Sequence, residues 1–153
     1  MLARKAAAIF AVFFGLVSLA GVSHAAQPEV YTGRFSKLAV DGYDPVAYFV
    51  SGAPVKGSSE FSLDYKGATW RFASAENLEK FKADPAAYAP QFGGYCAWAV
   101  AHGYTARGNP NFWAVVDGKL YLNYDGGVQK QWQEDVPGFI AQANANWPDV
   151  LKK

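Results

Sequence analysis

The amino-acid sequence predicts an α+β domain, with a small antiparallel sheet built from two hairpins and several short helices packed on it. Two stretches show strand-like alternation of apolar side chains around a glycine-containing turn. Between and after them lie segments with helix-capping residues and helical spacing of apolar positions. The chain has a single cysteine, so no internal disulfide can form and packing must supply the stability.

The first hairpin is predicted over residues 61–72. Residues 61–65 alternate apolar and polar side chains, and Lys66-Gly67 suits the turn. Trp70 and Phe72 then resume the alternation, so one face of this hairpin must be buried.

Two helices are expected next. Ser74 suits the N-cap of a helix over residues 75–82, in which Leu78 and Phe81 point inward. Asp84 and the proline after it begin a second, short helix that ends before Pro90.

The second hairpin is predicted over residues 113–122, with Asp117-Gly118 in a type I′ turn. Trp113 and Tyr121 are expected in the core. Residues 128–134 and 139–147 are expected to be helical, whereas residues 46–50 have the composition of a strand. No internal repeat is evident.

The N-terminus is typical of a secretory signal peptide, which we place at residues 1–25. Arg4 and Lys5 precede an apolar run, and Ser23-His24-Ala25 offers a cleavage site. We therefore expect a periplasmic or secreted protein with no membrane span after cleavage. Residues 26–37 are predicted to be an irregular lead-in and residues 38–150 a single domain.

Charge excludes one class of partner. The chain has 14 basic residues, of which Arg4 and Lys5 leave with the leader, against 13 acidic residues. With a near-neutral balance and no basic cluster, we expect no nucleic-acid partner.

The chemistry of the chain is concentrated in residues 88–103. This stretch holds Cys96 and, outside the leader, the only histidine, His102. A turn at Gly93-Gly94 should lead into a short helix that begins near Cys96, where the helix dipole favours a thiolate. The alternative is that Cys96 is an inert buried side chain.

Cys96 and His102 are also candidate metal ligands. On one continuous helix, residues six apart lie on different faces, which opposes their acting as a pair. A closed zinc site of three or four Cys or His ligands is impossible in one chain. A Cu(I) site at Cys96 would need a carboxylate, a backbone atom or a second molecule. Asp41 and Asp44 could face one point, but turn capping by aspartate is the simpler interpretation.

Several motifs together resemble the exported YHS domain-containing (seleno)proteins. They are Tyr43-Asp-Pro-Val-Ala-Tyr48, Phe72-Ala-Ser-Ala-Glu-Asn77, Phe81-Lys-Ala-Asp-Pro85, Tyr88-Ala-Pro90, Gly93-Gly-Tyr-Cys-Ala97, Val116-Asp-Gly-Lys-Leu-Tyr-Leu-Asn-Tyr124 and Trp147-Pro148. The resemblance implies a small α+β fold and metal binding, often of copper. It also implies a functional Cys96, because some members carry selenocysteine at the matching position. The literal Tyr-His-Ser triplet is absent, and no catalytic set carries over.

The leading hypothesis is a periplasmic binding protein that engages a soft metal ion, copper favoured, through Cys96. A homodimer or partner protein would supply the missing ligands. A thiol redox protein with Cys96 as its catalytic residue is the enzymatic alternative. A non-catalytic adaptor or small-ligand module is the third.

Overall fold

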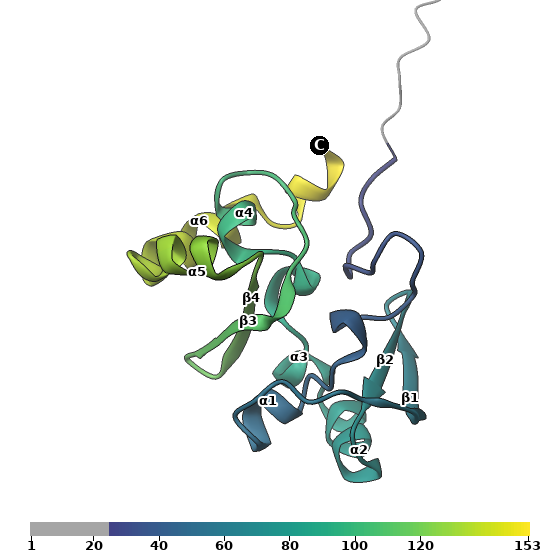
Figure 1. Ribbon diagram of the computed structural model, residues 1–153. Helices are drawn as coiled ribbons and strands as arrows, with labels where there is room; N and C mark the ends of the chain where they lie inside the picture. The colour runs from purple at the N-terminus through teal and green to yellow at the C-terminus, as the bar shows by residue number, and fades with distance from the viewer. Residues whose placement is uncertain (1–24) are drawn as a thin grey trace, which may run out of the picture.

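The computed structural model describes residues 25–153 (Figure 1). The expected signal peptide therefore lies, except for Ala25, outside the described residues. The α+β fold class is confirmed: hairpins and short helices alternate along the chain. In order, the elements are η1 (Val40–Gly42), α1 (Ala47–Val50), β1 (Ser58–Tyr65), β2 (Ala68–Phe72), α2 (Ala75–Ala83), α3 (Pro85–Tyr88), η2 (Gln91–Gly94), α4 (Ala97–Ala101), β3 (Asn109–Val116), β4 (Lys119–Asn123), α5 (Gly126–Gln133), α6 (Val136–Asn146) and η3 (Asp149–Lys152). No helix in residues 25–153 has the length and apolar character needed to cross a membrane.

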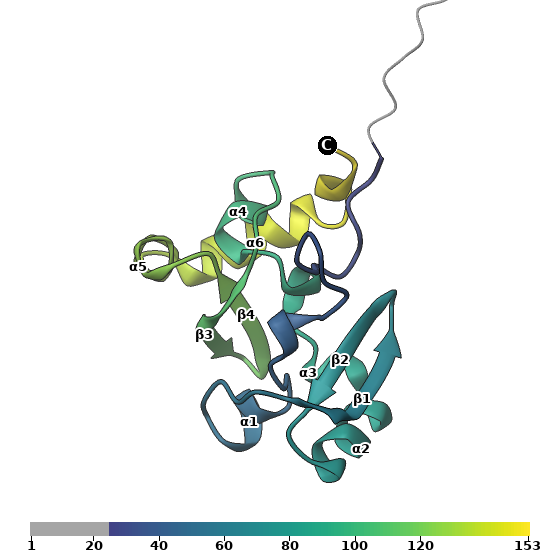
Figure 2. The ribbon, with the colours of Figure 1, turned by 45° about the vertical axis from the view of Figure 1, so that its right-hand side comes forward.

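The two hairpins form separate two-stranded sheets instead of joining into one. In Figures 1 and 2, β1 and β2 lie with α2 at the lower right, and β3 and β4 lie with α4, α5 and α6 at the upper left. Both predicted turns are present, at Lys66-Gly67 and Asp117-Gly118. All four turn residues have positive φ, as a type I′ turn requires.

The first hairpin buries one face. Ala68, Trp70 and Phe72 are buried and belong to one core cluster with Phe81 of α2. The intervening Thr69 and Arg71 are only partly buried. This one-sided burial produces the alternation that made the hairpin predictable.

The second hairpin is covered on both faces. Leu120 and Leu122 pack in the cluster of the first hairpin, and Tyr121 packs in a second cluster with Trp132. Trp113 and Tyr121 both pack against the core as predicted, but on opposite faces of the hairpin. The β3–β4 sheet thus separates the two core clusters.

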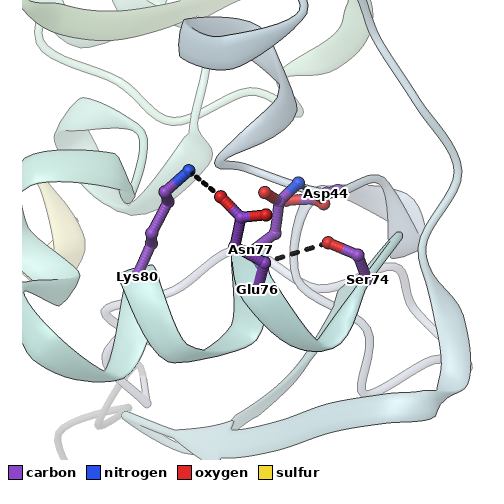
Figure 3. Close-up of polar contacts among 5 residues, drawn as sticks. All are labelled: Asp44, Ser74, Glu76, Asn77 and Lys80. Carbon is purple, nitrogen blue, oxygen red and sulfur yellow. Dashed lines mark hydrogen bonds and ion pairs between the residues drawn. The ribbon is translucent and has the colours of Figure 1, made fainter.

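The helix starts follow the predicted capping. The Ser74 side chain accepts a hydrogen bond from the amide of Asn77, 3.1 Å away (Figure 3). Asp84, Asp125 and Asp135 cap α3, α5 and α6 in the same way. At these positions, the carboxylate of an aspartate or the hydroxyl of a serine accepts hydrogen bonds from amides that have no partner within the helix.

Residues 46–50 are not a strand, and this expectation was wrong. They contain the helix α1, which follows the buried Asp44. The Asp44 Oδ1 accepts hydrogen bonds from the amides of Val46 at 2.8 Å and Ala47 at 3.3 Å. These bonds hold the first amides of a helical turn, and that tertiary arrangement overrides the strand composition.

The two hairpins correspond in their register, although the sequence shows no evident repeat. The β1–β2 ladder has a counterpart 51 positions later: Ser58 pairs with Phe72 as Asn109 pairs with Asn123, and both ladders have an irregularity after this pair. A left-handed turn precedes each hairpin, and a capped helix follows each. We refer to residues 40–88 as the first unit and to residues 92–139 as the second unit.

The lead-in before the first unit has no helix or strand, yet it is fastened to the second unit. The amide of Tyr31 donates to the carbonyl of Gly93 at 2.9 Å, and the Tyr95 hydroxyl donates to the carbonyl of Pro28 at 2.9 Å. The amide of Gln27 donates to the carbonyl of Leu151 at 2.7 Å. The first two bonds hold the lead-in against the turn that precedes Cys96, and the third joins it to η3.

Candidate functional site

A left-handed turn positions Cys96. Phe92, Gly93 and Gly94 have φ values of 55°, 61° and 83°. A Cβ at Gly93 would come within 1.7 Å of the carbonyl oxygen of Glu29, so no larger residue fits there without backbone movement. The predicted role of the glycine pair as a turn is therefore correct.

Cys96 is the N-cap residue of α4 and does not lie within its first turn. Its amide donates to the carbonyl of Ala106 at 2.9 Å, and its backbone forms a bridge with Leu122 of β4. Its exposed fraction is 1%. The cysteine is thus held by backbone contacts on two sides, and its sulfur is nearly inaccessible from the outer surface.

Cys96 lines a pocket of about 240 Å³. The pocket is lined by Cys96, Trp98, Ala99, Tyr104, Ala106, Tyr124 and Val128. Tyr104 and Tyr124 are each 46% exposed, so they form the mouth of the pocket. The site therefore combines one soft sulfur atom with an aromatic and aliphatic wall.

Burial raises the pKa of the Cys96 thiol above its ordinary value. Hydrogen bonds from the backbone amides of Ala99, Tyr124 and Trp98 act in the opposite direction, and the charge of Asp125 adds to the increase. The helix N-terminus does favour a thiolate, as the sequence suggested, but loss of hydration outweighs it. The free thiol is consequently the resting form at neutral pH.

A buried amide lies beside the thiol. Asn123, the last residue of β4, has no exposed surface, and its Oδ1 lies 3.7 Å from the Cys96 Sγ. The same oxygen accepts from the amide of Trp98 at 3.3 Å. Its Nδ2 has no hydrogen-bond partner, which is costly in a buried position.

His102 lies at the other end of α4 and is exposed. Its Nδ1 is 2.7 Å from the carbonyl oxygen of Trp98, and its ring stacks on the Trp98 ring with centroids 3.8 Å apart. The structure thus places Trp98 between the two sequence-predicted ligands: its ring lines the Cys96 pocket and also stacks on His102.

Asp41 and Asp44 also do not converge. Asp41 is exposed, whereas Asp44 is fully buried and accepts hydrogen bonds from four donors. Both of its oxygens are occupied by the protein itself. Asp44 therefore has the structural role of a capping residue, as the simpler interpretation of the sequence predicted.

Within residues 25–153, no group of three or more His, Cys, Asp or Glu side chains could hold a metal ion. A closed site made by the described chain alone does not fit the donor set. Cys96 is the one soft ligand type that the described residues offer at this pocket.

Residues 46–92 match the family model of the YHS domain, which confirms the YHS resemblance over this segment. A YHS domain is suggestive of a metal-binding module. No curated protein and no solved structure matches the chain. The matched segment covers most of the first unit and ends before Cys96, so the match itself assigns no role to the cysteine.

Sequence reasoning found Cys96 but missed the remainder of the pocket. Tyr104, Tyr124 and Val128 come from a loop, the residue after β4 and a helix, and the sequence did not single out Asn123. The available signal was the spacing of the two hairpins, because Asn123 and Val128 stand 51 positions after Phe72 and Asn77.

Proposed function

We propose that this protein is a periplasmic, non-catalytic YHS-type binding module whose Cys96 pocket holds a soft metal ion, Cu(I) favoured. The observation that carries the proposal is that the buried Cys96 lines a largely apolar pocket. A thiolate is the ligand type that selects Cu(I). Export is the part of the proposal that rests on residues 1–25.

The surroundings of the sulfur suit a single cationic partner. The backbone amides of Ala99, Tyr124 and Trp98 lower the pKa of the thiol against the effect of burial, so they favour the thiolate left after proton loss. The faces of Trp98, Tyr104 and Tyr124 offer favourable quadrupoles to a desolvated cation. The second ligand comes from outside the chain, either from a small thiol or from a second protein molecule.

Proton release gives the proposal a pH signature. Because burial raises the pKa of the thiol, metal binding at neutral pH must displace a proton. We expect the apparent affinity for Cu(I) to rise about tenfold per pH unit below the thiol pKa.

The test is a Cu(I) titration of the reduced, processed protein against a chromophoric Cu(I) chelator at pH 6.5, 7.5 and 8.5. Cys96→Ser should lose Cu(I) retention while its Tm stays close to that of the wild type. His102→Ala is the matched control and should retain the metal. Equal Cu(I) stoichiometry in wild type and Cys96→Ser would disprove the proposal, and a ratio of one ion to two chains would identify a shared site.

The apolar lining favours a second candidate, a small-ligand or adaptor module in which Cys96 is inert. This candidate predicts no Cu(I) binding. It also predicts that the pocket binds an apolar fluorescent probe and that Val128→Leu prevents this binding. The thiol redox alternative has less support, because a peroxide-reactive cysteine needs a thiolate at neutral pH and burial opposes one here.

A further inference from the structure

Asp44 and Cys96 occupy the same position in the two units. Each follows a turn with positive φ that ends in a glycine and a tyrosine, Gly42-Tyr43 and Gly94-Tyr95. The tyrosines form equivalent antiparallel bridges, with Lys56 in the first unit and Arg107 in the second. A short helix then begins in each unit, α1 after Asp44 and α4 after Cys96.

The donors around the two side chains also correspond. The Asp44 carboxylate accepts from the amides two and three residues later, and its Oδ2 accepts from the amide of Ala73 at 2.8 Å. The amides that lower the pKa of the Cys96 thiol are likewise those two and three residues later, plus that of Tyr124, and the first of them also donates to the Asn123 Oδ1 at 3.3 Å. Ala73 and Tyr124 each directly follow the second strand of their hairpin.

One donor differs. In the first unit, Asn77 of α2 donates its Nδ2 to the Asp44 Oδ2 at 2.7 Å (Figure 3). The counterpart of Asn77 is Val128, because the amides of both residues bond to the N-cap side chain of their helix. Val128 cannot donate, and it lines the pocket over Cys96. The pocket is therefore lined by Val128, the residue that stands where Asn77 donates in the first unit.

A second observation points to a ligand at this place. Asn123 replaces Phe72 of the first unit, its Oδ1 lies 3.7 Å from the sulfur, and its buried Nδ2 has no partner. An acceptor on a bound partner is the group that would satisfy this donor.

We propose that residues 40–88 and 92–139 are two copies of one structural unit, and that the second copy converts a buried carboxylate site into a thiolate site. The amides of Trp98, Ala99 and Tyr124 hold the sulfur as an anion when a soft cation or electrophile enters beside Val128. In the first copy the site has a structural role, because the Asn77 side chain supplies the fourth hydrogen bond to the Asp44 carboxylate. This inference concerns the pocket of the proposed function but does not require a metal.

The decisive experiment converts the second site into the first. In the double variant Cys96→Asp with Val128→Asn, the new carboxylate should receive all four donors. We therefore expect a cooperative thermal transition within about 5 °C of the wild type. The matched control is Ala143→Asp, at a buried small residue in the interior of α6, where the backbone amides are bonded within the helix. A buried charge without a partner there should lower the Tm by about 15 °C or prevent folding.

Equal destabilisation of the double variant and the Ala143→Asp control would overturn the inference. A second measurement uses the native cysteine, through the thiolate absorbance of Val128→Asn and Val128→Leu across pH. The asparagine adds a donor and should lower the thiol pKa relative to the leucine, which only fills the pocket. If the thiol titrates identically in the two variants, the proposed set of donors around the Cys96 sulfur is wrong.

The two proposals can fail separately. If the double variant folds but the wild type takes up no Cu(I), the equivalence of the two sites is supported and the metal proposal is wrong. If Cu(I) binds through Cys96 but the double variant behaves like the control, the metal proposal stands and the equivalence of the two sites is wrong.

Discussion

In the first unit the buried Asp44 has hydrogen-bond donors on both carboxylate oxygens, whereas in the second unit the buried Asn123 keeps an Nδ2 without a partner. The two units share the hairpin register, the left-handed turns and the helix caps. A closed polar network is what stability alone requires. The first unit also has a buried polar atom without a partner, the Nε of Arg71, but the unpartnered Nδ2 of Asn123 lies next to a thiol, as the proposed binding site requires.

The largest expected effect breaks the closed network. Asp44→Ala leaves the buried Nδ2 of Asn77 and the amide of Ala73 without their acceptor. We expect a loss of about 3–5 kcal/mol in the free energy of unfolding, measured by urea denaturation. Glu79→Ala on the exposed face of α2 is the control and should change stability by less than about 0.5 kcal/mol. A cost below about 1 kcal/mol for Asp44→Ala would show that the first site is not a structural anchor.

A smaller effect tests a bond between the two units. The hydroxyl of Tyr48, in α1, donates to the carbonyl of Pro110 in β3 at 2.9 Å. Burial raises the pKa of this hydroxyl, so it stays a donor throughout the accessible pH range. Tyr48→Phe should cost about 1–2 kcal/mol, whereas Tyr124→Phe, at an exposed ring, should be nearly neutral. Equal costs for the two would mean that the bond between units does not stabilise the fold.

The smallest effect concerns the pH dependence of the second unit. The pKa of Cys96 is raised by burial, so on alkaline titration the unfolded chain releases this proton first, at about pH 8.5. The contribution of the buried thiol is therefore complete below that pH and is lost as the pH rises toward the folded-state pKa. Between pH 8.5 and 10, the stability of wild type relative to Cys96→Ala should fall by up to about 1.4 kcal/mol per pH unit.

Urea denaturation of both proteins across this range checks the prediction, and the difference between them removes the contribution of tyrosines and lysines. A constant difference would show that the thiol titrates alike in the folded and unfolded chains. An increasing difference would mean a lowered thiol pKa and would favour the redox alternative.

The sequence by itself determined the elements whose signals are local. The hairpin at residues 61–72 was predictable because only one of its faces is buried, and Ser74 and Asp84 were predictable as caps because capping needs only neighbouring amides. Cys96 was predictable as the chemical centre because it is the only thiol in the chain.

Tertiary structure decided the rest. Residues 46–50 form a helix because Asp44 bonds to their first amides while it is held by Asn77, 33 positions away in the chain. Residues 120–123 show no alternation because core covers both faces of β4. The correspondence of the two units was not evident in the sequence because they share what the backbone requires, such as Gly57 and Gly108 at close approaches, but differ in the side chains that meet across elements. The environment of the thiol depends on such contacts between elements, and no spacing within one segment encodes them.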